Sequence, residues 1–528
     1  MAINQYYIKT LIAITLTTFL YTGHAELNDL TQTPNSAGAG IHKALEDQIG
    51  TGRGDLHTPD SSIFIINRDP LRAIRRGRQI FQRKWQVAQG FGPRVNDGIG
   101  DIELDAGLGA GLADSCAACH GRPKGSAGFG GDVYTRPDSR DAPHLFGLGL
   151  IEQLADEITQ DLRAKQKQAL HIARKRGAPV TKALISKNIE YGHITAHPNG
   201  TVDTKNLQGI DVDLRVKPFF AEGSEFSIRG FVVGAFAAEM GLQAADPDLN
   251  AAANGRNVVT PAGMLLSGSV DQINASPSTS ALADPDGDGV INEVDPALVD
   301  YVEFYLLNYF RPATYRKTFK TIYGFHLFKQ IGCANCHIPN LLVNNDRRVA
   351  DVDTRYDEKQ GGFFNQLYAT ITARFRKLQD VSRFPALKLS QGKSFLVKGI
   401  FTDFKRHDLG KGFYERNFDG TFQREFMTRP LWGVGSTAPY GHDGRSNDLH
   451  QVIIRHGGEA ENPSQNYAQL PSWYRDAIQH FLRSLVLFPP GDTPSNLNPK
   501  NPGKMDYPQR GHGSVRLTGV FNNPSDPE

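Results

Sequence analysis

Two short motifs use all four cysteines of this 528-residue chain. Each is Cys-x-x-Cys-His, in "SCAACHGRP" at 115–123 and in "GCANCHIPN" at 332–340. The pattern is typical of c-type haem attachment, in which both thiols form thioethers with the porphyrin and the adjacent histidine binds iron. A zinc site is the structural alternative, but ligation by all four cysteines would make the two adjacent histidines coincidental. The sequence therefore predicts two covalently bound haem c groups. The predicted attachment residues are Cys116, Cys119, Cys333 and Cys336, and the predicted iron ligands within the motifs are His120 and His337.

Apolar helices are predicted on both sides of these motifs. Leu71, Ile74, Phe81 and Trp85 fall on one helical face before the first motif, and a similar stripe over 478–485 follows the second. Glycine (54 residues) and proline (30 residues) are frequent, which indicates many loops. We therefore expect a mainly α fold, with two cytochrome c-like haem domains, long loops and few short strands.

The length leaves room for two or three domains. Residues 245–300 are rich in Ala, Asp, Asn, Gly and Ser, which is typical of an inter-domain connection. The predicted parts are a signal peptide (1–25), an N-terminal cytochrome c-like haem domain with insertions (26–244), a linker (245–300), a C-terminal cytochrome c-like haem domain (301–490) and an irregular tail (491–528).

The N-terminus has the pattern of a secretory signal. Lys9 precedes the apolar run "LIAITLTTFLY", and Gly23 and Ala25 have the spacing of a cleavage site. The run is too short to cross a bilayer, so we expect cleavage after Ala25 and an exported, periplasmic protein that does not span the membrane. An ordinary soluble start is the alternative. Lys and Arg (58) nearly balance Asp and Glu (56), which gives no electrostatic case for nucleic acid as a partner.

The linker contains "DPDGDGVINEVD" (284–295), whose oxygen-bearing residues have the spacing of an EF-hand calcium loop. A glycine stands at position 6, as the turn requires, but position 12 is Asp instead of the usual bidentate Glu. The sequence predicts a calcium ion here, with a solvated acidic turn as the alternative. The predicted ligands are Asp284, Asp286, Asp288, Val290 through its carbonyl, Asn292 and Asp295.

"NDLHQVIIRHGG" (447–458) predicts a short helix that begins at Asn447 and ends at the two glycines. Leu449, Val452 and His456 share one face, whereas His450 lies six residues earlier on the other side. His456 should therefore point into the core. A histidine on an apolar face is usually an ordinary core residue, and the pattern alone does not make it a ligand.

A family resemblance adds to this interpretation. "TRPLWGVGSTAPYGHDGRSNDLHQVIIRH" (428–456) resembles the C-terminal signature of bacterial di-haem cytochrome c peroxidases and of the di-haem enzyme that matures methylamine dehydrogenase. "SCAACHGRP", "DAPHLFGLGLIEQLADEI", "DPDGDGVINE", "HDLG" and "HGGEA" are similar to the di-haem oxidoreductase family with thiol-oxidoreductase-like members. This likeness extends from about residue 70 to 486.

The resemblance implies roles for particular residues. The family's distal ligand of the second haem lies fourteen residues after the Pro-Tyr-x-His-Asp-Gly histidine, which here is His456. By the same comparison His442 matches an active-site histidine, and Glu152 is the candidate for the carboxylate above the first haem. Arg136 stands where the peroxidases carry a removable distal histidine, which is consistent with an open iron at the first haem. The alternative is a sixth ligand from another side chain: Tyr134, His144 or Met240.

The resemblance therefore implies a peroxidase-like oxidoreductase. Its substrate would be a small oxidant such as hydrogen peroxide, and a periplasmic protein would donate or accept electrons. Two alternatives stay open: an electron-transfer cytochrome with both irons six-coordinate, and a dioxygen-using relative.

Overall fold

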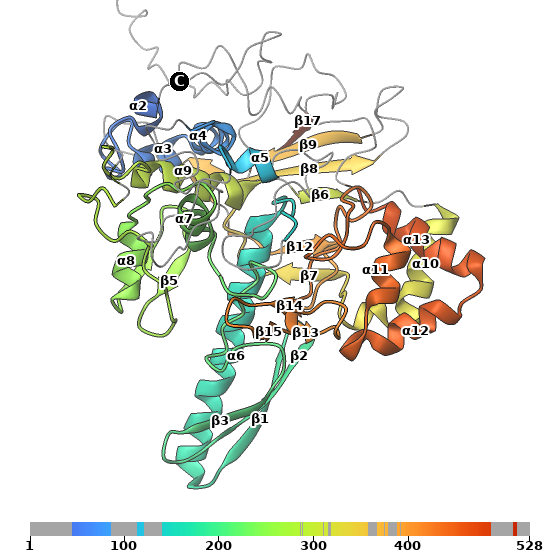
Figure 1. The fold of residues 1–528 in the computed structure, drawn as a ribbon. Helices are drawn as coiled ribbons and strands as arrows, with labels where there is room; N and C mark the ends of the chain where they lie inside the picture. Colours follow the sequence, from blue (N-terminus) through green and yellow to red (C-terminus); the bar gives the residue numbers. More distant parts are fainter. Residues whose placement is uncertain are drawn as a thin grey trace, which may run out of the picture.

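The computed structural model describes residues 45–85, 113–120, 140–285, 287, 289–309, 311–314, 318–356, 367–373, 375–377, 388–390, 392–486 and 511–514 (Figure 1). The helices within these ranges are α2 (Leu45–Ile49), α3 (Ser62–Arg68), α4 (Pro70–Gln82), α5 (Cys116–His120), α6 (Leu148–Arg176), α7 (Ile228–Ala238), α8 (Pro247–Ala253), α9 (Pro296–Asn308), α10 (Phe319–Gln330), η3 (Cys333–Asn335), α11 (Leu449–Arg455), η4 (Gly458–Ala460), α12 (Glu461–Gln469) and α13 (Ser472–Arg483).

The same ranges hold many short strands in several small sheets, the largest of which has the order β17-β9-β8-β6. The strands are β1 (Val180–Ser186), β2 (Ile189–Ala196), β3 (Val202–Leu207), β4 (Asn257–Val259), β5 (Leu265–Ser267), β6 (Arg311–Thr314), β7 (Asn340–Val343), β8 (Ala350–Tyr356), β9 (Leu367–Ala373), β10 (Phe375–Lys377), β11 (Lys388–Ser390), β12 (Phe395–Lys398), β13 (Arg406–Asp408), β14 (Glu415–Arg416), β15 (Phe422–Gln423), β16 (Glu425–Met427) and β17 (Gly511–Ser514).

The expected mainly α fold with two cytochrome c-like haem domains is therefore wrong, because helices and sheets are mixed along the chain. The β1–β2 hairpin shows one reason for the error. Its connection is Lys187-Asn188, and both residues have positive φ angles (49° and 64°), as a type I′ turn requires. A Lys-Asn pair is a weaker hairpin signal than Asn-Gly, so this sheet was not expected. The predicted domain boundaries stay a prediction.

Helix α9 is the centre of the main apolar core, and all but the first of its residues are buried. Helices α3, α4 and α7 pack against it. Gly77 of α4 allows the closest contact, because a Cβ atom at this position would lie 2.1 Å from the carbonyl oxygen of Tyr301. The helix predicted before the first motif is confirmed as α4, which ends at Gln82.

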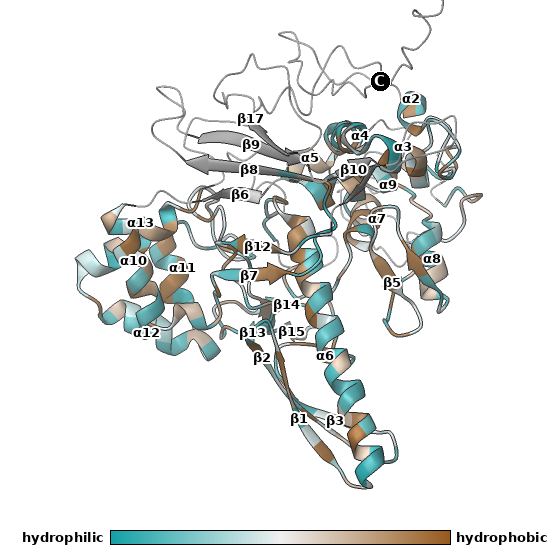
Figure 2. Ribbon diagram, turned by 180° about the vertical axis from the view of Figure 1, so that it is seen from behind, coloured by the Kyte–Doolittle hydropathy of each residue, from teal (hydrophilic) through white to brown (hydrophobic). Residues whose placement is uncertain are grey.

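Helix α6 extends from this core into an arm that β1, β2 and β3 cover (Figure 1). Its first half, from Leu148 to Leu162, is mostly buried, whereas its last turn carries three exposed basic residues, Arg174, Lys175 and Arg176. The hydropathy of the helix changes accordingly along its length (Figure 2). The buried half matters for the site, because it leads directly from residues 140–147.

Helices α10 to α13 gather on the opposite side of the molecule from α2, α3 and α4 (Figure 1). Helices α10 and α13 pack around a second apolar cluster that includes Phe328, Phe401 and Phe481. Helix α10 leads into η3, which carries Cys333. None of the helices in the described ranges is long and apolar enough to cross a bilayer.

Candidate functional site

A single cavity of about 1040 Å³ is lined by residues of both Cys-x-x-Cys-His motifs. The first motif reaches it from α5, and the second reaches it from η3 and the residues that follow. Ligand pockets commonly measure about 300–1,000 Å³, so this space is large even for a cofactor. The predicted site residues on its wall are Cys116, Cys119, His120, Cys333, Cys336, His337, His442 and His456.

The three predicted iron ligands share one arrangement. The Nδ1 atoms of His120, His337 and His456 lie 2.7, 3.1 and 2.6 Å from the carbonyl oxygens of Pro143, Phe401 and Val452. Since a carbonyl can only accept, each ring donates from Nδ1 and keeps the lone pair of Nε2 free. Metal-binding histidines are usually oriented in this way by a hydrogen bond from the other ring nitrogen.

Burial keeps these imidazoles neutral. It lowers the pKa of His120 and of His456, and burial together with the charge of His456 lowers the pKa of His337 to about 4. Only a neutral imidazole binds a metal, so the three rings are in the required state at pH 7. His337 and His456 both line the cavity.

The four cysteines form no disulfide with one another. Burial raises the pKa of Cys116 and of Cys333 to about 12, so these thiols stay protonated at pH 7. Among the described residues, the four sulfurs do not meet in one potential metal site, as the zinc alternative would require. The cavity that the two pairs share and the free thiols fit two haem groups with thioether links.

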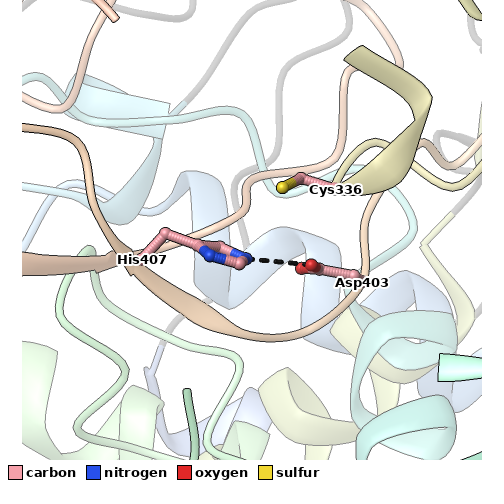
Figure 3. Close-up of side chains that lie close together, drawn as sticks. All are labelled: Cys336, Asp403 and His407. Atoms are coloured by element: carbon pink, nitrogen blue, oxygen red, sulfur yellow. Dashed lines mark hydrogen bonds and ion pairs between the residues drawn. The ribbon is translucent and has the colours of Figure 1, made fainter. Parts of the chain in front are cut away.

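Cys336 belongs to a second cluster, with Asp403 and His407 (Figure 3). Their potential ligand atoms lie within 4.8 Å of one another. His407 is held at both nitrogens, by Asp403 at 2.9 Å and by Glu459 at 2.8 Å. Burial lowers its pKa, but the hydrogen bonds to Asp403 and Cys336 raise it more, to about 11. A charged His407 cannot bind a metal, and a thioether at Cys336 would exclude a metal–thiolate bond there.

His442 lies on the cavity wall beside other charged groups. Its ring stacks on Phe426 with centroids 4.0 Å apart, and its Nε2 lies 3.5 Å from Oε2 of Glu415. Burial is the main reason that the pKa of His442 falls to about 4; the charge of Asp443 raises this pKa, and nearby arginines lower it. A neutral His442 can accept a proton at pH 7 from a molecule in the cavity.

A comparison with protein families finds a match in the C-terminal segment that carries His407, His442 and His456. Residues 389–485 match the family model described as "Di-haem oxidoreductase, putative peroxidase". Over this segment the chain is similar to the di-haem oxidoreductase family. The predicted resemblance is thereby confirmed, and the family implies haem cofactors and a peroxidase-like oxidoreductase. No curated protein matches the chain significantly.

The matched segment includes His407, His442 and His456, but both Cys-x-x-Cys-His motifs lie before it. The assignments to individual haem groups therefore rest on the cavity and on the sequence motifs. Of the other predicted site residues, Arg136 and Tyr134 lie outside the described residues.

His144 and Met240, the remaining candidates for a sixth ligand of the first haem, both line the cavity. Nδ1 of His144 accepts from the N–H of Phe146 at 3.3 Å, and its Nε2 donates to the carbonyl of Trp432 at 3.0 Å. With both nitrogens engaged, His144 has no lone pair left for iron in this arrangement. The thioether of Met240 stays a candidate.

Glu152 does not line the cavity. Its side chain is 2% exposed and accepts hydrogen bonds from the N–H of Ile228 at 2.8 Å and from Arg347 at 2.6 Å. These contacts join α6 to α7 and to the 347 loop. A catalytic role for Glu152 stays a prediction, and its contacts are those of a structural residue.

The calcium prediction falls partly on Asp286 and Asp288, which lie outside the described residues. The Asp284 carboxylate accepts from the N–H groups of Gly287 and Gly289 at 2.8 and 2.9 Å. Asn292 accepts from Ala245 at 2.9 Å, and Asp295 caps α9 by accepting from Ala297 at 2.8 Å. These oxygens keep further lone pairs, so calcium binding stays a prediction.

The sequence interpretation missed the ion pair between Arg140 and Glu415, which lies beside His442. Arg140 forms a bidentate ion pair with Glu415, with contacts of 2.8–3.0 Å, and also binds Glu222 at 2.5 Å. Arg140 and Glu415 are 275 residues apart in the chain. No local pattern could have paired them.

Proposed function

We propose that this protein is an exported, peroxidase-like c-type enzyme with one electron-transfer haem and one catalytic haem. The observation that supports this most strongly is the cavity that both Cys-x-x-Cys-His motifs share. Two attachment motifs on one wall would bring two haem groups close enough to exchange electrons.

Cys116, Cys119 and His120 would hold the first haem, and Cys333, Cys336 and His337 the second. Bound haem supplies redox-active iron and, where a coordination position is open, a place for an oxidant to react. The side chains of the protein decide which iron is open and how protons reach the oxidant.

His456 would complete the coordination of the second haem. Its free Nε2 and its place on the cavity wall that His337 also lines support this assignment. Two imidazole ligands stabilise the ferric state more than a histidine and a methionine do, so the second haem should have a low potential. The first haem would keep an open position. His144 uses both of its nitrogens within the protein, so Met240 is the competing sixth ligand among the described candidates.

His442 would move the protons. The reduction of hydrogen peroxide to two waters consumes two electrons and two protons, and the near oxygen must lose a proton that the leaving oxygen gains. A neutral His442 can take up that proton and return it. Glu415, at 3.5 Å from Nε2, would orient the ring and stabilise its protonated form.

A periplasmic protein would be the electron donor, and the second haem, held by Cys333, Cys336 and His337, would supply the redox-active iron that it reduces. Export is supported by Lys9, the apolar run that follows and the small residues that end at Ala25. A calcium ion in the loop 284–295 would fasten the loop at the start of α9, where Asp295 already acts as the helix cap.

The test is peroxide reduction by the protein produced with c-type haem maturation. Mass spectrometry should show two covalent haem groups, and each peroxide consumed should oxidise two equivalents of a one-electron donor. A protein that carries both haem groups but leaves peroxide unconsumed would contradict the peroxidase function. Uptake of dioxygen in its place would assign the dioxygen-using alternative.

A further inference from the structure

Arg429 differs from the other arginine on the cavity wall. Arg140 is neutralised by Glu415 and Glu222. The guanidinium of Arg429 has no hydrogen bond or ion pair with any part of the chain that the structure describes. It is half-buried and faces the cavity, and Glu222, the described carboxylate whose charge acts on it, is hydrogen-bonded to Arg140.

The backbone holds Arg429 in place from both sides. The N–H of Thr428 donates to the carbonyl of Lys405 at 2.9 Å, and the N–H of Leu431 donates to the carbonyl of Ile400 at 3.1 Å. The carbonyl of Trp432 accepts from His144 at 3.0 Å. Pro430 restricts the backbone between these anchors. The backbone that carries Arg429 is therefore positioned before any ligand arrives.

The surroundings of Arg429 favour an anion as the missing partner. Burial lowers the pKa of Arg429 to about 10. The charge of Glu222 raises this pKa, and the charge of Arg140 lowers it. A partly desolvated cation without a partner is costly, and a bound anion removes that cost. The planar guanidinium matches a carboxylate through two parallel hydrogen bonds.

The position within the cavity is at the first motif. His120 donates to the carbonyl of Pro143 at 2.7 Å, and the next residue, His144, donates to the carbonyl of Trp432, three residues after Arg429, at 3.0 Å. His442 lies within the influence of Arg429. The same end of the cavity therefore holds the first attachment motif, the proton-transfer candidate and a guanidinium that makes no direct ion pair with the described residues.

We propose that Arg429 is a carboxylate-binding group at the first haem site. This rests on the proposed function, because the carboxylate would be either a propionate of the first haem or a carboxylate of a substrate that enters beside it. Both sources offer a planar carboxylate to the N–H groups of the Arg429 guanidinium.

The test compares the holoprotein with Arg429→Gln and Arg429→Lys. Arg424→Gln is the control, because Arg424 is an exposed arginine five residues away that lies over the ring of Tyr414. Two quantities are measured for each: the reduction potential of the first haem, and the Soret response to benzoate as a probe carboxylate. Haem content and peroxide reduction are recorded on the same samples, so failure of the proposed function is recognised separately.

If the partner is the propionate, Arg429→Gln should lower the reduction potential of the first haem, because a nearby cation favours the ferrous form. Benzoate should then have no effect on the Soret band of any variant. If the partner is a substrate, benzoate should bind the wild type and bind Arg429→Gln about 10- to 100-fold more weakly, the factor expected for a hydrogen bond to a charged group. Arg429→Lys should restore part of either effect. A potential and a benzoate response equal to wild type in Arg429→Gln would overturn the proposal.

Discussion

His450 and His456 lie on or at the end of the same short helix, α11, and face different surroundings. His456 ends the helix, lines the cavity and donates from Nδ1 to the carbonyl of Val452. His450 is exposed and reaches the hydroxyl of Tyr467 at 3.2 Å. The direction of His456 agrees with the expectation from the helical pattern, although Asp448, not Asn447, caps the helix.

Replacing His456 by alanine should therefore convert the second haem from low spin to high spin, with both haem groups still attached. His450→Ala, a change of the same size on the same helix, should leave the spectrum unchanged. Electron paramagnetic resonance and the haem stoichiometry measure both. A low-spin second haem in His456→Ala would show that another residue is the ligand.

His442→Ala should depress the reaction with peroxide and leave both spin states unchanged, because His442 acts on the oxidant and not on iron. General acid–base catalysis contributes about 10²- to 10⁴-fold, so the second-order rate constant should fall by that order. Stopped-flow spectroscopy measures the rate constant. The exposed His171 on α6 supplies a control, as His171→Ala should react like wild type. Equal rates for His442→Ala and wild type would place the proton transfer elsewhere.

At the scale of elements, a buried charge network joins α7, α8 and α9. Arg229 of α7 is fully buried and binds Asp246 at 2.6 Å, Asp300 at 2.8 Å and Glu303 at 2.9 Å. These carboxylates outnumber the positive charge of Arg229. Burial accordingly raises the pKa of Glu303 to about 7, although Arg229 lowers it.

Arg229→Met should destabilise the protein by about 3–5 kcal/mol, because it leaves the buried Asp246 and Glu303 without their cation, whereas Asp300 keeps its ion pair with Arg53. Glu303→Gln should cost much less at pH 7, since Glu303 is partly protonated at that pH. Urea denaturation monitored by circular dichroism measures the free energy of unfolding of each. An Arg229→Met protein as stable as wild type would show that the network contributes nothing to stability.

The calcium loop gives a second prediction for an element. A bound calcium ion would stabilise the native state by linkage, so chelation should lower the melting temperature. Asp284→Ala should melt at the temperature of the chelated wild type and show no further change on chelation. If chelation changes neither protein, residues 284–295 are an acidic turn without calcium.

Local patterns predicted the motifs and the short helices, and they failed for the sheets. Helix α4 could be predicted because its apolar face recurs within a few turns. Strand β9 could not, since it pairs with β8 and with β17, which begins more than a hundred residues later at Gly511. The position-based choice of Glu152 had the same weakness, because only the folded chain shows that Arg347 engages its carboxylate.

At the scale of the whole molecule, the notable feature is that two motifs more than two hundred residues apart open onto one space. The first comes from the side of α4 and α9, and the second comes from the side of α10 and α13 (Figure 1). Residues 428–442 and 456 complete the wall between them. This arrangement supports the proposal that the two haem groups have different roles, one in electron transfer and the other in the reaction with the oxidant.

The central claim is that one iron is open and the other has two histidine ligands. Low-temperature electron paramagnetic resonance of the as-isolated ferric protein with two covalent haem groups tests it most directly. The account predicts one high-spin signal from the first haem and one low-spin signal from the second, in equal amounts. Two low-spin signals would contradict it, because both irons would then be closed, as in an electron-transfer cytochrome.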